Sequence, residues 1–498
     1  MATVEFIGTY SHLPICGSTI MYIALISVVF VSWFCITHGL FFDGFNILLK
    51  ELNETASVLD SSAIRTKWIE QPMDHFNETE TRTWKMKYFQ RMDKWKPLGP
   101  VYVYISGEWK ARKGFLQTGI MYELAKETDG AMFLTEHRYY GDSKPFDDFT
   151  TENLQYLSSR QALADLAYLI DMIKKSPRFY LSKVVVVGGS YAGNLAAWMK
   201  LLYPNLIDAA IASSGPVLAK EDYFEYIDTV SDDFEQYGTP DCYEKITEIF
   251  NKYEEKFKTE SGIKQLKEEE QICDETDMNK KENKELFFLD KMSEFMSIAQ
   301  YGSPDRIKKH CEEICNSSQV FSTKDDETGM WNKKKQCYDY GFESMIEDIK
   351  TIDWNHAWTY QTCTEFGYYS ITAPENHPFT ENVHLDFFYK MCTDLFGPEF
   401  DGARVEESVK KTNEMYGGLN PNVTHVVFVN GDLDPWHRLG ILEDISYDAP
   451  AKIIPHASHC RDLLSNRKSD PEELKEARKY IKYLIKKWIG AGEYIIGA

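Results

Sequence analysis

The chain has 498 residues, of which 43% are hydrophobic and 14% aromatic. This composition excludes a disordered protein and a small disulfide scaffold, and the length allows one very large core or two to four ordinary ones. Lys and Arg number 55 against 77 Asp and Glu, so the formal net charge is −22. So acidic a surface repels phosphate, which argues against general nucleic-acid binding.

The N-terminal part contains one long apolar run, residues 20–36 (IMYIALISVVFVSWFCI). It is just long enough to span a bilayer and slightly long for the core of a signal peptide. Thr37 and Gly39 are small residues at positions −3 and −1 of a possible cleavage site. We expect residues 1–39 to be a secretory signal peptide of a secreted or lysosomal protein. The alternative is an uncleaved signal anchor, which would make the protein a type II membrane protein.

Two features of the remaining chain fit export. Eight cysteines lie outside residues 1–39, and an even number in an exported chain predicts four disulfides. Cys311 and Cys315 lack a matching Cys/His pair at zinc-ligand spacing, so we expect no metal, and no organic cofactor is implied. Sequons for N-glycosylation occur at Asn53, Asn77, Asn316 and Asn422.

Apolar runs and helical stripes alternate along the chain. Runs bounded by turns predict strands that are buried on both faces. Residues 161–175 carry an apolar stripe of a helix, and residues 469–488 begin with a cap and a proline before a similar stripe. This alternation predicts a mostly parallel sheet with helices on both faces. The strand-like runs are residues 101–105, 131–135, 184–187 and 425–429, with a shorter one at 452–454.

The alternation breaks between residues 217 and 420. This stretch is mainly helical in pattern and holds seven of the eight cysteines. Its charged run, residues 264–285, is expected to be a solvated face or loop. We therefore predict an α/β core in two pieces, residues 40–216 and 421–498, with a helical, disulfide-stapled cap inserted at 217–420.

The most specific local motif is GGSYAG at residues 188–193, between a predicted strand and a predicted helix. A serine on such a turn is the nucleophile elbow of α/β-hydrolases, which needs small residues two positions before and after the serine. Here these residues are Gly188 and Ala192 around Ser190. The Tyr191 N–H is the expected first oxyanion donor. The alternative is a glycine-rich turn without a catalytic role.

A nucleophilic serine needs a base and an acid, and in this fold the chain order is serine, acid, histidine. Asp434 follows the last long strand, and His459 comes 25 residues later, after the short strand-like run. Asp432 is a rival for the acid, and His456 or His437 is a rival for the base.

Residues 68–488 resemble the family of serine peptidases that contains lysosomal Pro-X carboxypeptidase, dipeptidyl peptidase II and thymus-specific serine protease. Many separate matches in the same order make this resemblance more specific than any single motif. The matches at 360–367 and 458–460 resemble the thymus-specific branch most. The matching motifs are 71–77 (QPMDHFN), 107–108 (GE), 136–141 (EHRYYG), 188–198, 360–367 (YQTCTEFG), 430–436 (NGDLDPW) and 458–459 (SH).

The resemblance implies roles for individual residues. It makes Ser190 the nucleophile, His459 the base and Asp434, rather than Asp432, the acid. It also implies an α/β-hydrolase core, a helical cap that closes over the site, and cleavage next to proline. Trp436 matches a family tryptophan that lines the proline pocket.

The chain departs from the family pattern near this pocket. Asn194 stands where the carboxypeptidase branch has Met, and residues 460–463 read CRDL where HLDL is usual. We count Asn194 among the pocket residues. Cys460 is expected to be bridged to the cap, and a reactive thiol is the alternative.

Two glutamates complete the predicted site. Glu108 follows the first buried strand, where this fold places its second oxyanion N–H, although it also fits a structural ion pair. Glu365 in the cap motif is a candidate for binding a substrate amine, and pairing with an arginine is the alternative.

Together these features predict an exported, glycosylated Ser-His-Asp exopeptidase that acts on peptides, as a carboxypeptidase or a dipeptidyl peptidase. A secreted esterase or lipase on the same fold is one alternative, and a catalytically silent hydrolase-like binding protein is another. A homodimer is left open.

Overall fold

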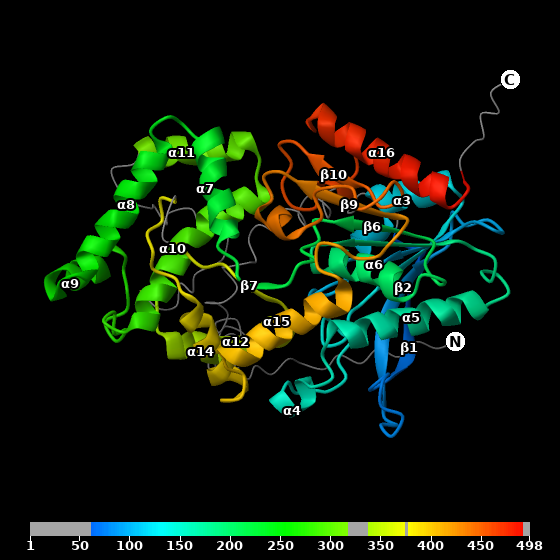
Figure 1. Cartoon of the computed structure of the whole chain (residues 1–498), viewed down its shortest axis with the longest axis horizontal. Helices are drawn as coiled ribbons and strands as arrows, with labels where there is room; N and C mark the ends of the chain where they lie inside the picture. The colour runs from blue at the N-terminus through cyan, green and yellow to red at the C-terminus, as the bar shows by residue number, and fades with distance from the viewer. Residues whose placement is uncertain (1–60, 317–336, 374–376, 492–498) are drawn as a thin grey trace, which may run out of the picture.

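The computed structural model describes residues 61–316, 337–373 and 377–491 (Figure 1). The predicted leader, residues 1–39, and the sequon at Asn53 lie outside the described residues. Within them, no helix is both long enough and apolar enough to cross a bilayer.

The core is built on one eight-stranded sheet. Its first three strands in spatial order are antiparallel neighbours, and all the later pairs are parallel. A second sheet pairs β7 (Lys220–Asp222) with β8 (Gly367–Tyr369). The order across the large sheet is β1 (Ile64–Pro72), β2 (Thr83–Arg91), β4 (Ala131–Thr135), β3 (Val101–Tyr104), β5 (Val184–Gly189), β6 (Ala209–Ser213), β9 (Val426–Gly431) and β10 (Ala451–Ile454).

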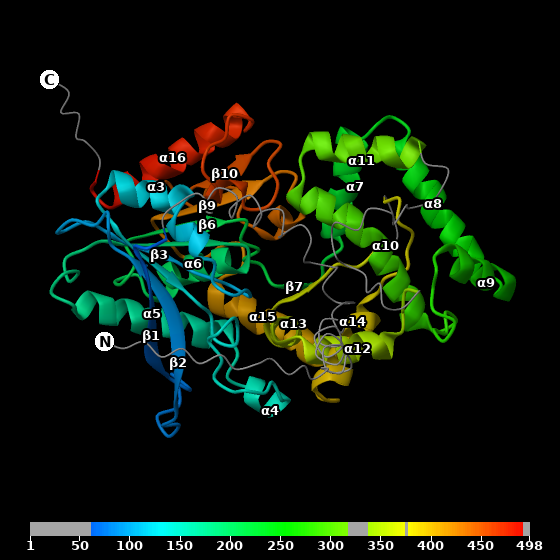
Figure 2. The same cartoon turned by 180° about the vertical axis from the view of Figure 1, so that it is seen from behind.

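Helices cover both faces of the sheet (Figures 1 and 2). α3 (Ile120–Glu127) and α16 (Glu472–Trp488) pack on one face, and α5 (Ser159–Lys175) and α6 (Tyr191–Leu202) pack on the other. Side chains alternate along a strand, so each central strand contributes residues to the apolar clusters on both faces of the sheet. In β3, for example, Val101 and Val103 face α5 and α6, and the two intervening positions face α3 and α16. Short helices in the connections are η1 (Lys113–Leu116), α4 (Thr151–Leu154), η3 (Pro435–Leu439) and η4 (Arg461–Leu463).

Between β6 and β9 the chain leaves the large sheet and forms a mainly helical insertion, which we call the cap. In Figure 1 its helices α7 to α11 form a body beside the core. The fold is therefore an α/β-hydrolase core with an inserted helical cap. The cap helices are α7 (Glu225–Tyr237), α8 (Cys242–Phe257), α9 (Glu260–Glu269), α10 (Lys281–Tyr301), α11 (Pro304–Asn316), α12 (Phe342–Thr351), α13 (Asp353–Gln361), α14 (Leu385–Phe396) and α15 (Gly402–Tyr416), with a π turn, η2 (Thr362–Phe366), after α13.

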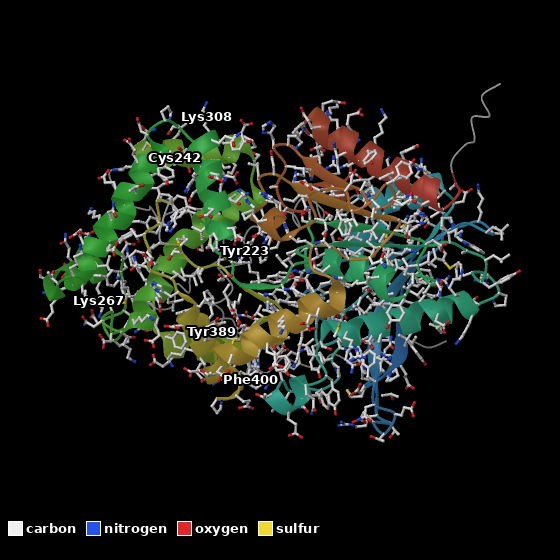
Figure 3. The ribbon with its side chains drawn as sticks, in the orientation of Figure 1. Tyr223, Cys242, Lys267, Lys308, Tyr389 and Phe400 are labelled. Carbon is white, nitrogen blue, oxygen red and sulfur yellow. A yellow bond between two sulfur atoms is a disulfide. The ribbon has the colours of Figure 1, made fainter. Side chains whose placement is uncertain are left out.

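The cap and the core share one apolar cluster and are joined by buried hydrogen bonds. The Tyr140 hydroxyl of the core donates to Gln361 Oε1 of α13 at 2.7 Å. The Tyr223 hydroxyl donates to the Pro435 carbonyl, and Figure 3 shows Tyr223 where the cap meets the core. These contacts fix the cap relative to the turns that carry the predicted site.

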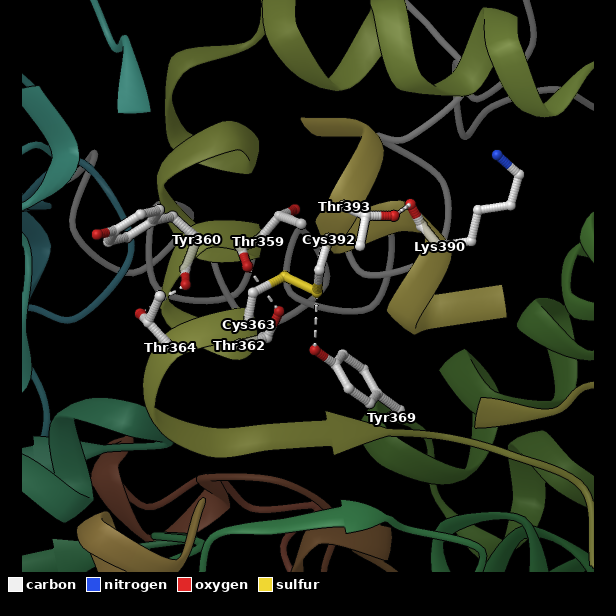
Figure 4. The surroundings of a disulfide bond; sticks show 9 residues. All are labelled: Thr359, Tyr360, Thr362, Cys363, Thr364, Tyr369, Lys390, Cys392 and Thr393. Atoms are coloured by element: carbon white, nitrogen blue, oxygen red, sulfur yellow. Dashed lines mark hydrogen bonds between the residues drawn. A yellow bond between two sulfur atoms is a disulfide. The ribbon is translucent and has the colours of Figure 1, made fainter. Parts of the chain in front are cut away.

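Three disulfides hold the cap together: Cys242–Cys311, Cys273–Cys337 and Cys363–Cys392. Figure 4 shows the third, which joins η2 to α14, with the Tyr369 hydroxyl 3.2 Å from Cys392 Sγ. The prediction of a disulfide-stapled cap is confirmed.

The prediction of a fourth disulfide is wrong, and so is the predicted bridge from Cys460 to the cap. Cys315 and Cys460 are free thiols. Cys460 is buried in the core between the sheet and α16, and its Sγ lies 2.8 Å from where a Cβ on Gly189 would stand. The Cys460 side chain thus packs on the side of the sheet that faces α16, and six cap cysteines are bonded to one another.

The three described sequon residues, Asn77, Asn316 and Asn422, are all exposed. Asn77 Oδ1 accepts hydrogen bonds from the backbone and the hydroxyl of Thr79. Their glycosylation stays a prediction.

Candidate active site

Ser190 occupies a sharp turn between β5 and α6. Its backbone φ of 59° and ψ of −135° are unusual for a residue with a side chain, which is strain of the kind found at functional turns. The turn requires glycine at position 188, because a Cβ there would lie 1.9 Å from the Ala192 carbonyl oxygen. The sequence therefore folds locally as the predicted elbow.

The two predicted oxyanion donors lie on adjoining segments. Tyr191 is the first residue of α6, so its N–H has no acceptor within the helix. The loop after β3 packs against this helix start, since a Cβ on Gly107 would lie 3.3 Å from the Ala192 nitrogen. A carbonyl oxygen placed between the loop and the helix start would be near backbone N–H groups from both sides.

Asp434 and His459 form a buried pair. Asp434 Oδ2 lies 2.8 Å from His459 Nδ1, and the two residues are 0% and 1% exposed. The other Asp434 oxygen accepts from the Trp436 N–H at 3.1 Å, and the His459 N–H donates to the Gln300 carbonyl at 2.8 Å. Burial opposes a charged imidazole, but the Asp434 carboxylate holds the His459 pKa well above its usual range. The pair thus stabilises an imidazolium.

The rival residues have other partners. Asp432 Oδ1 accepts from the His456 N–H at 2.6 Å, and the His456 ring nitrogen Nδ1 lies 3.0 Å from the Tyr237 hydroxyl. His437 Nδ1 lies 2.7 Å from the Asp434 carbonyl oxygen rather than from a carboxylate. The Asp434 carboxylate is therefore paired with the His459 ring and with neither rival histidine.

The second ring nitrogen of His459 has no hydrogen-bond partner in the part of the chain that the structure describes. His459 Nε2 is buried, and Ser190 does not bond to it. A histidine whose Nδ1 is fixed by a carboxylate presents Nε2 as a base, and such contacts often tighten only when substrate binds.

Ser190 lines a pocket between the core and the cap. Aromatic side chains from both the core and the cap form most of its wall. Trp436 is one of them, and its ring centroid lies 5.4 Å from that of Tyr368. The lining residues are Glu108, Trp109, Ser190, Tyr191, Pro216, Gln300, Tyr301, Trp354, Trp358, Tyr368 and Trp436.

Sequence reasoning missed four aromatic residues of this wall that the cap contributes: Tyr301, Trp354, Trp358 and Tyr368. Their spacing carries no signal, because aromatic residues on cap helices pack into a core just as often as they line a pocket.

Glu108 is also part of the wall, and it is 8% exposed. Burial raises its pKa to about 7, against the lowering effects of hydrogen bonds from its own backbone N–H and the Trp109 side chain and of the nearby His459. The predicted structural ion pair is not found, since no ion pair among the described residues includes Glu108.

The structure gives Asn194 and Glu365 places behind the wall. The Asn194 side-chain N–H₂ donates to the Pro216 carbonyl at 3.0 Å and to the Tyr368 hydroxyl at 3.3 Å. The Glu365 carboxylate accepts from the Ser159 N–H at 2.9 Å and from the Ser159 hydroxyl at 2.6 Å, at the start of α5. Asn194 therefore supports two lining residues. The partner of the Glu365 carboxylate is Ser159, whereas the sequence suggested a substrate amine or an arginine.

A further acid, Asp233 on α7, was not singled out from the sequence. It is 4% exposed, and its Oδ2 has no partner among the described residues. Burial and the neighbouring Asp432, Asp232 and Asp434 raise its pKa to about 9. Asp233 is thus a neutral carboxylic acid beside the Asp434 turn at physiological pH.

Comparison with known proteins identifies the family of the chain. Thymus-specific serine protease of Mus musculus is 30% identical over 450 residues, covering 85% of this chain and 87% of its own length. Lysosomal Pro-X carboxypeptidase of Bos taurus is 29% identical over 456 residues, covering 85% and 87%. A putative serine protease of Caenorhabditis elegans is 32% identical over 453 residues, covering 84% and 87%. The family model described as serine carboxypeptidase S28 matches residues 71–481. The chain belongs to this family of serine peptidases.

Proposed function

We propose that this serine peptidase is an exopeptidase that cleaves peptides next to proline, with Ser190, His459 and Asp434 as its catalytic residues. The observation that carries this proposal is the buried Asp434–His459 pair beside a strained serine turn that opens into an aromatic pocket.

In this mechanism the Ser190 hydroxyl oxygen attacks the scissile carbonyl carbon while His459 Nε2 takes the hydroxyl proton. The Tyr191 N–H and an N–H of the loop after β3 bind the oxyanion that forms. His459 then gives the proton to the leaving amine, and an acyl-enzyme on Ser190 remains. A water molecule, deprotonated by His459, attacks the acyl carbon, and His459 returns this proton to the Ser190 oxygen as the acid product leaves. Asp434 holds the imidazole in place and stabilises its charged form throughout.

The preference for proline is supported by the pocket wall. A proline ring offers apolar faces, which pack well against flat aromatic side chains. Within a peptide it has no N–H, so an aromatic wall without a hydrogen-bond acceptor suits it. Trp436 meets Tyr223 and Tyr226 at ring distances of 5.4 and 5.6 Å, which fixes its indole in the wall. The relatives named Pro-X carboxypeptidase add support for the same preference.

A secreted or lysosomal setting is supported by the three disulfides, which persist in oxidising compartments, and by the lysosomal relatives. Peptides are the proposed partners in that setting.

The experiment compares the wild type with Ser190→Ala and with Ser446→Ala, which changes an exposed serine. Each protein receives peptide pairs that differ only in Pro or Ala beside the scissile bond. We expect Ser446→Ala to match the wild type, Ser190→Ala to lose activity about 10⁴-fold or more, and the proline peptide to be the better substrate. Unchanged turnover by Ser190→Ala would refute the catalytic assignment. Equal rates on both peptides would refute the proline preference, and turnover of acyl esters alone would indicate an esterase.

A further inference from the structure

We infer that Glu108 binds the free amino terminus of the peptide, so that the enzyme removes residues from the amino end of its substrate. This inference rests on the proposed function, in which a peptide is attacked by Ser190, and adds the end from which the peptide is cleaved.

The charge of the pocket wall is the first observation. Among the described residues that line the pocket, Glu108 is the one acidic side chain, and there is no Lys or Arg. An enzyme that holds the carboxyl end of a peptide needs a cation for the terminal carboxylate, and arginine is the usual partner. This pocket offers the opposite charge.

The aromatic wall favours the same ligand. Trp and Tyr rings carry negative faces, which attract ammonium groups and repel carboxylates. Four tryptophans and three tyrosines line the pocket. A peptide ammonium therefore meets both a carboxylate and ring faces, whereas a peptide carboxylate meets neither a cation nor a favourable ring face.

Glu108 itself has no lysine or arginine beside it in the pocket lining. It is 8% exposed, its pKa is raised by burial to about 7, and in the described parts of the chain it forms no ion pair with Lys or Arg. A charged carboxylate buried without a cation is costly, and an ammonium group in contact with it removes this cost. Glu365, the acid predicted to bind an amine, is already bonded to Ser159 and lies outside the lining.

The position of Glu108 places this ammonium near the reacting centre. Gly107, the preceding residue, packs against the start of α6, which begins directly after Ser190. The next residue, Trp109, lies against Trp354 of the cap with ring centroids 4.7 Å apart. An ammonium bound by Glu108 is therefore held between the serine turn and the cap, and the released fragment is a short amino-terminal one.

The first test uses the wild-type protein and four versions of one proline-containing peptide: unmodified, N-acetylated, C-amidated, and modified at both ends. We expect N-acetylation to lower kcat/KM about 10- to 100-fold, the range expected for one lost charged hydrogen bond, and C-amidation to have little effect. Mass spectrometry should find the short product at the amino end. A loss on C-amidation with none on N-acetylation would overturn the inference and still leave a working serine peptidase. Absence of turnover on all four peptides, or turnover that Ser190→Ala leaves unchanged, would instead refute the proposed function.

The second test uses Glu108→Gln, with Glu152→Gln on the exposed surface of α4 as its control. Glu108→Gln should raise KM for the unmodified peptide about 10- to 100-fold and affect the slow turnover of the N-acetylated peptide much less. Glu152→Gln should behave as the wild type. An equal loss on both peptides would show that Glu108 acts on the catalytic residues and not on the amine, which would overturn the inference. If Glu108→Gln fails to fold, the wild-type comparison still decides.

Discussion

The Asp434 carboxylate and the His459 imidazole lie 2.8 Å apart in a region closed to solvent. The two residues come from different turns at the carboxyl edge of the sheet, after β9 and after β10. The backbone N–H of Trp436 holds Asp434, and the backbone carbonyl of Gln300 on α10 holds His459. The cap therefore helps to orient the histidine of the core.

Asp434→Asn tests this pair, and Asp432→Asn, two residues earlier in the chain, is its control. An amide in place of the Asp434 carboxylate no longer stabilises the imidazolium or selects the correct tautomer. We expect kcat to fall about 10⁴-fold with little change in KM. Asp432 bonds to the His456 N–H instead, so Asp432→Asn should keep most of its activity. Steady-state kinetics on a proline peptide measures both, and a larger loss for Asp432→Asn would contradict the assignment of the acid.

Gly188→Ala tests the serine turn. The new methyl group would lie 1.9 Å from the Ala192 carbonyl, so β5 and α6 must move apart. We expect the free energy of unfolding to fall by about 1–3 kcal/mol. We also expect Ser190 to lose its reaction with a fluorophosphonate, a covalent label for activated serines. Gly341→Ala is the control, because its methyl group would meet only side-chain atoms, the nearest at 3.1 Å. Urea denaturation of both variants gives the comparison, and equal stability would argue against a tight elbow.

Removal of the Cys363–Cys392 disulfide should destabilise the cap. This bridge closes a loop with a sequence separation of 29 residues. We expect the double variant Cys363→Ala/Cys392→Ala to lose about 2–4 kcal/mol of unfolding free energy. Cys315→Ala, at an exposed free thiol, should lose almost none. If the Cys315 variant proved the less stable of the two, the disulfide pairing described above would be incorrect.

Asp233 should make the protein less stable as the pH rises. Its folded pKa is about 9, whereas an unfolded aspartate has a pKa of about 4. Between these values the unfolded chain has lost the proton that the folded chain keeps, so the stability falls by at most about 1.4 kcal/mol per pH unit.

Asp233→Asn removes this dependence, since an amide mimics the neutral acid. Urea unfolding at pH 5, 6, 7 and 8 should therefore show that the free energy of unfolding of the variant rises relative to that of the wild type as the pH increases. Asp147→Asn, at an exposed position, should run parallel to the wild type. If the Asp233→Asn curve also stayed parallel, Asp233 would be charged in the folded protein.

The fold was predictable where residues of one type are concentrated. The run at 131–135 became β4 (Ala131–Thr135), and the stripe at 161–175 became most of α5 (Ser159–Lys175). The edge strands β1 and β2 were missed because they mix charged and apolar residues on a partly exposed hairpin. β6 was missed because its sequence, AAIAS, has little strand propensity of its own.

The charged run at 264–285 shows a related difficulty. It contains the end of α9, a connecting segment and the start of α10, and so it is neither one face nor one loop. Charge indicates exposure but does not indicate where a helix ends.

The site was predictable where chemistry fixes the sequence locally. The glycine of the serine turn and the acid before Pro435 carry their own signals. The aromatic residues that the cap contributes to the pocket wall carry no such signal, because only tertiary packing brings them to the core. That Cys460 is a free thiol was missed for the same reason. Disulfide pairing depends on which sulfurs meet in the fold, and Cys460 lies between the sheet and α16.

The most direct test of the catalytic account is covalent labelling of the folded protein with a fluorophosphonate, followed by digestion and mass spectrometry of the labelled peptide. A fluorophosphonate reacts with a serine only when a base activates its hydroxyl. The account predicts one label, on Ser190, that is absent from Ser190→Ala and strongly reduced in Asp434→Asn. A label on another serine, or none on correctly folded protein, would contradict it.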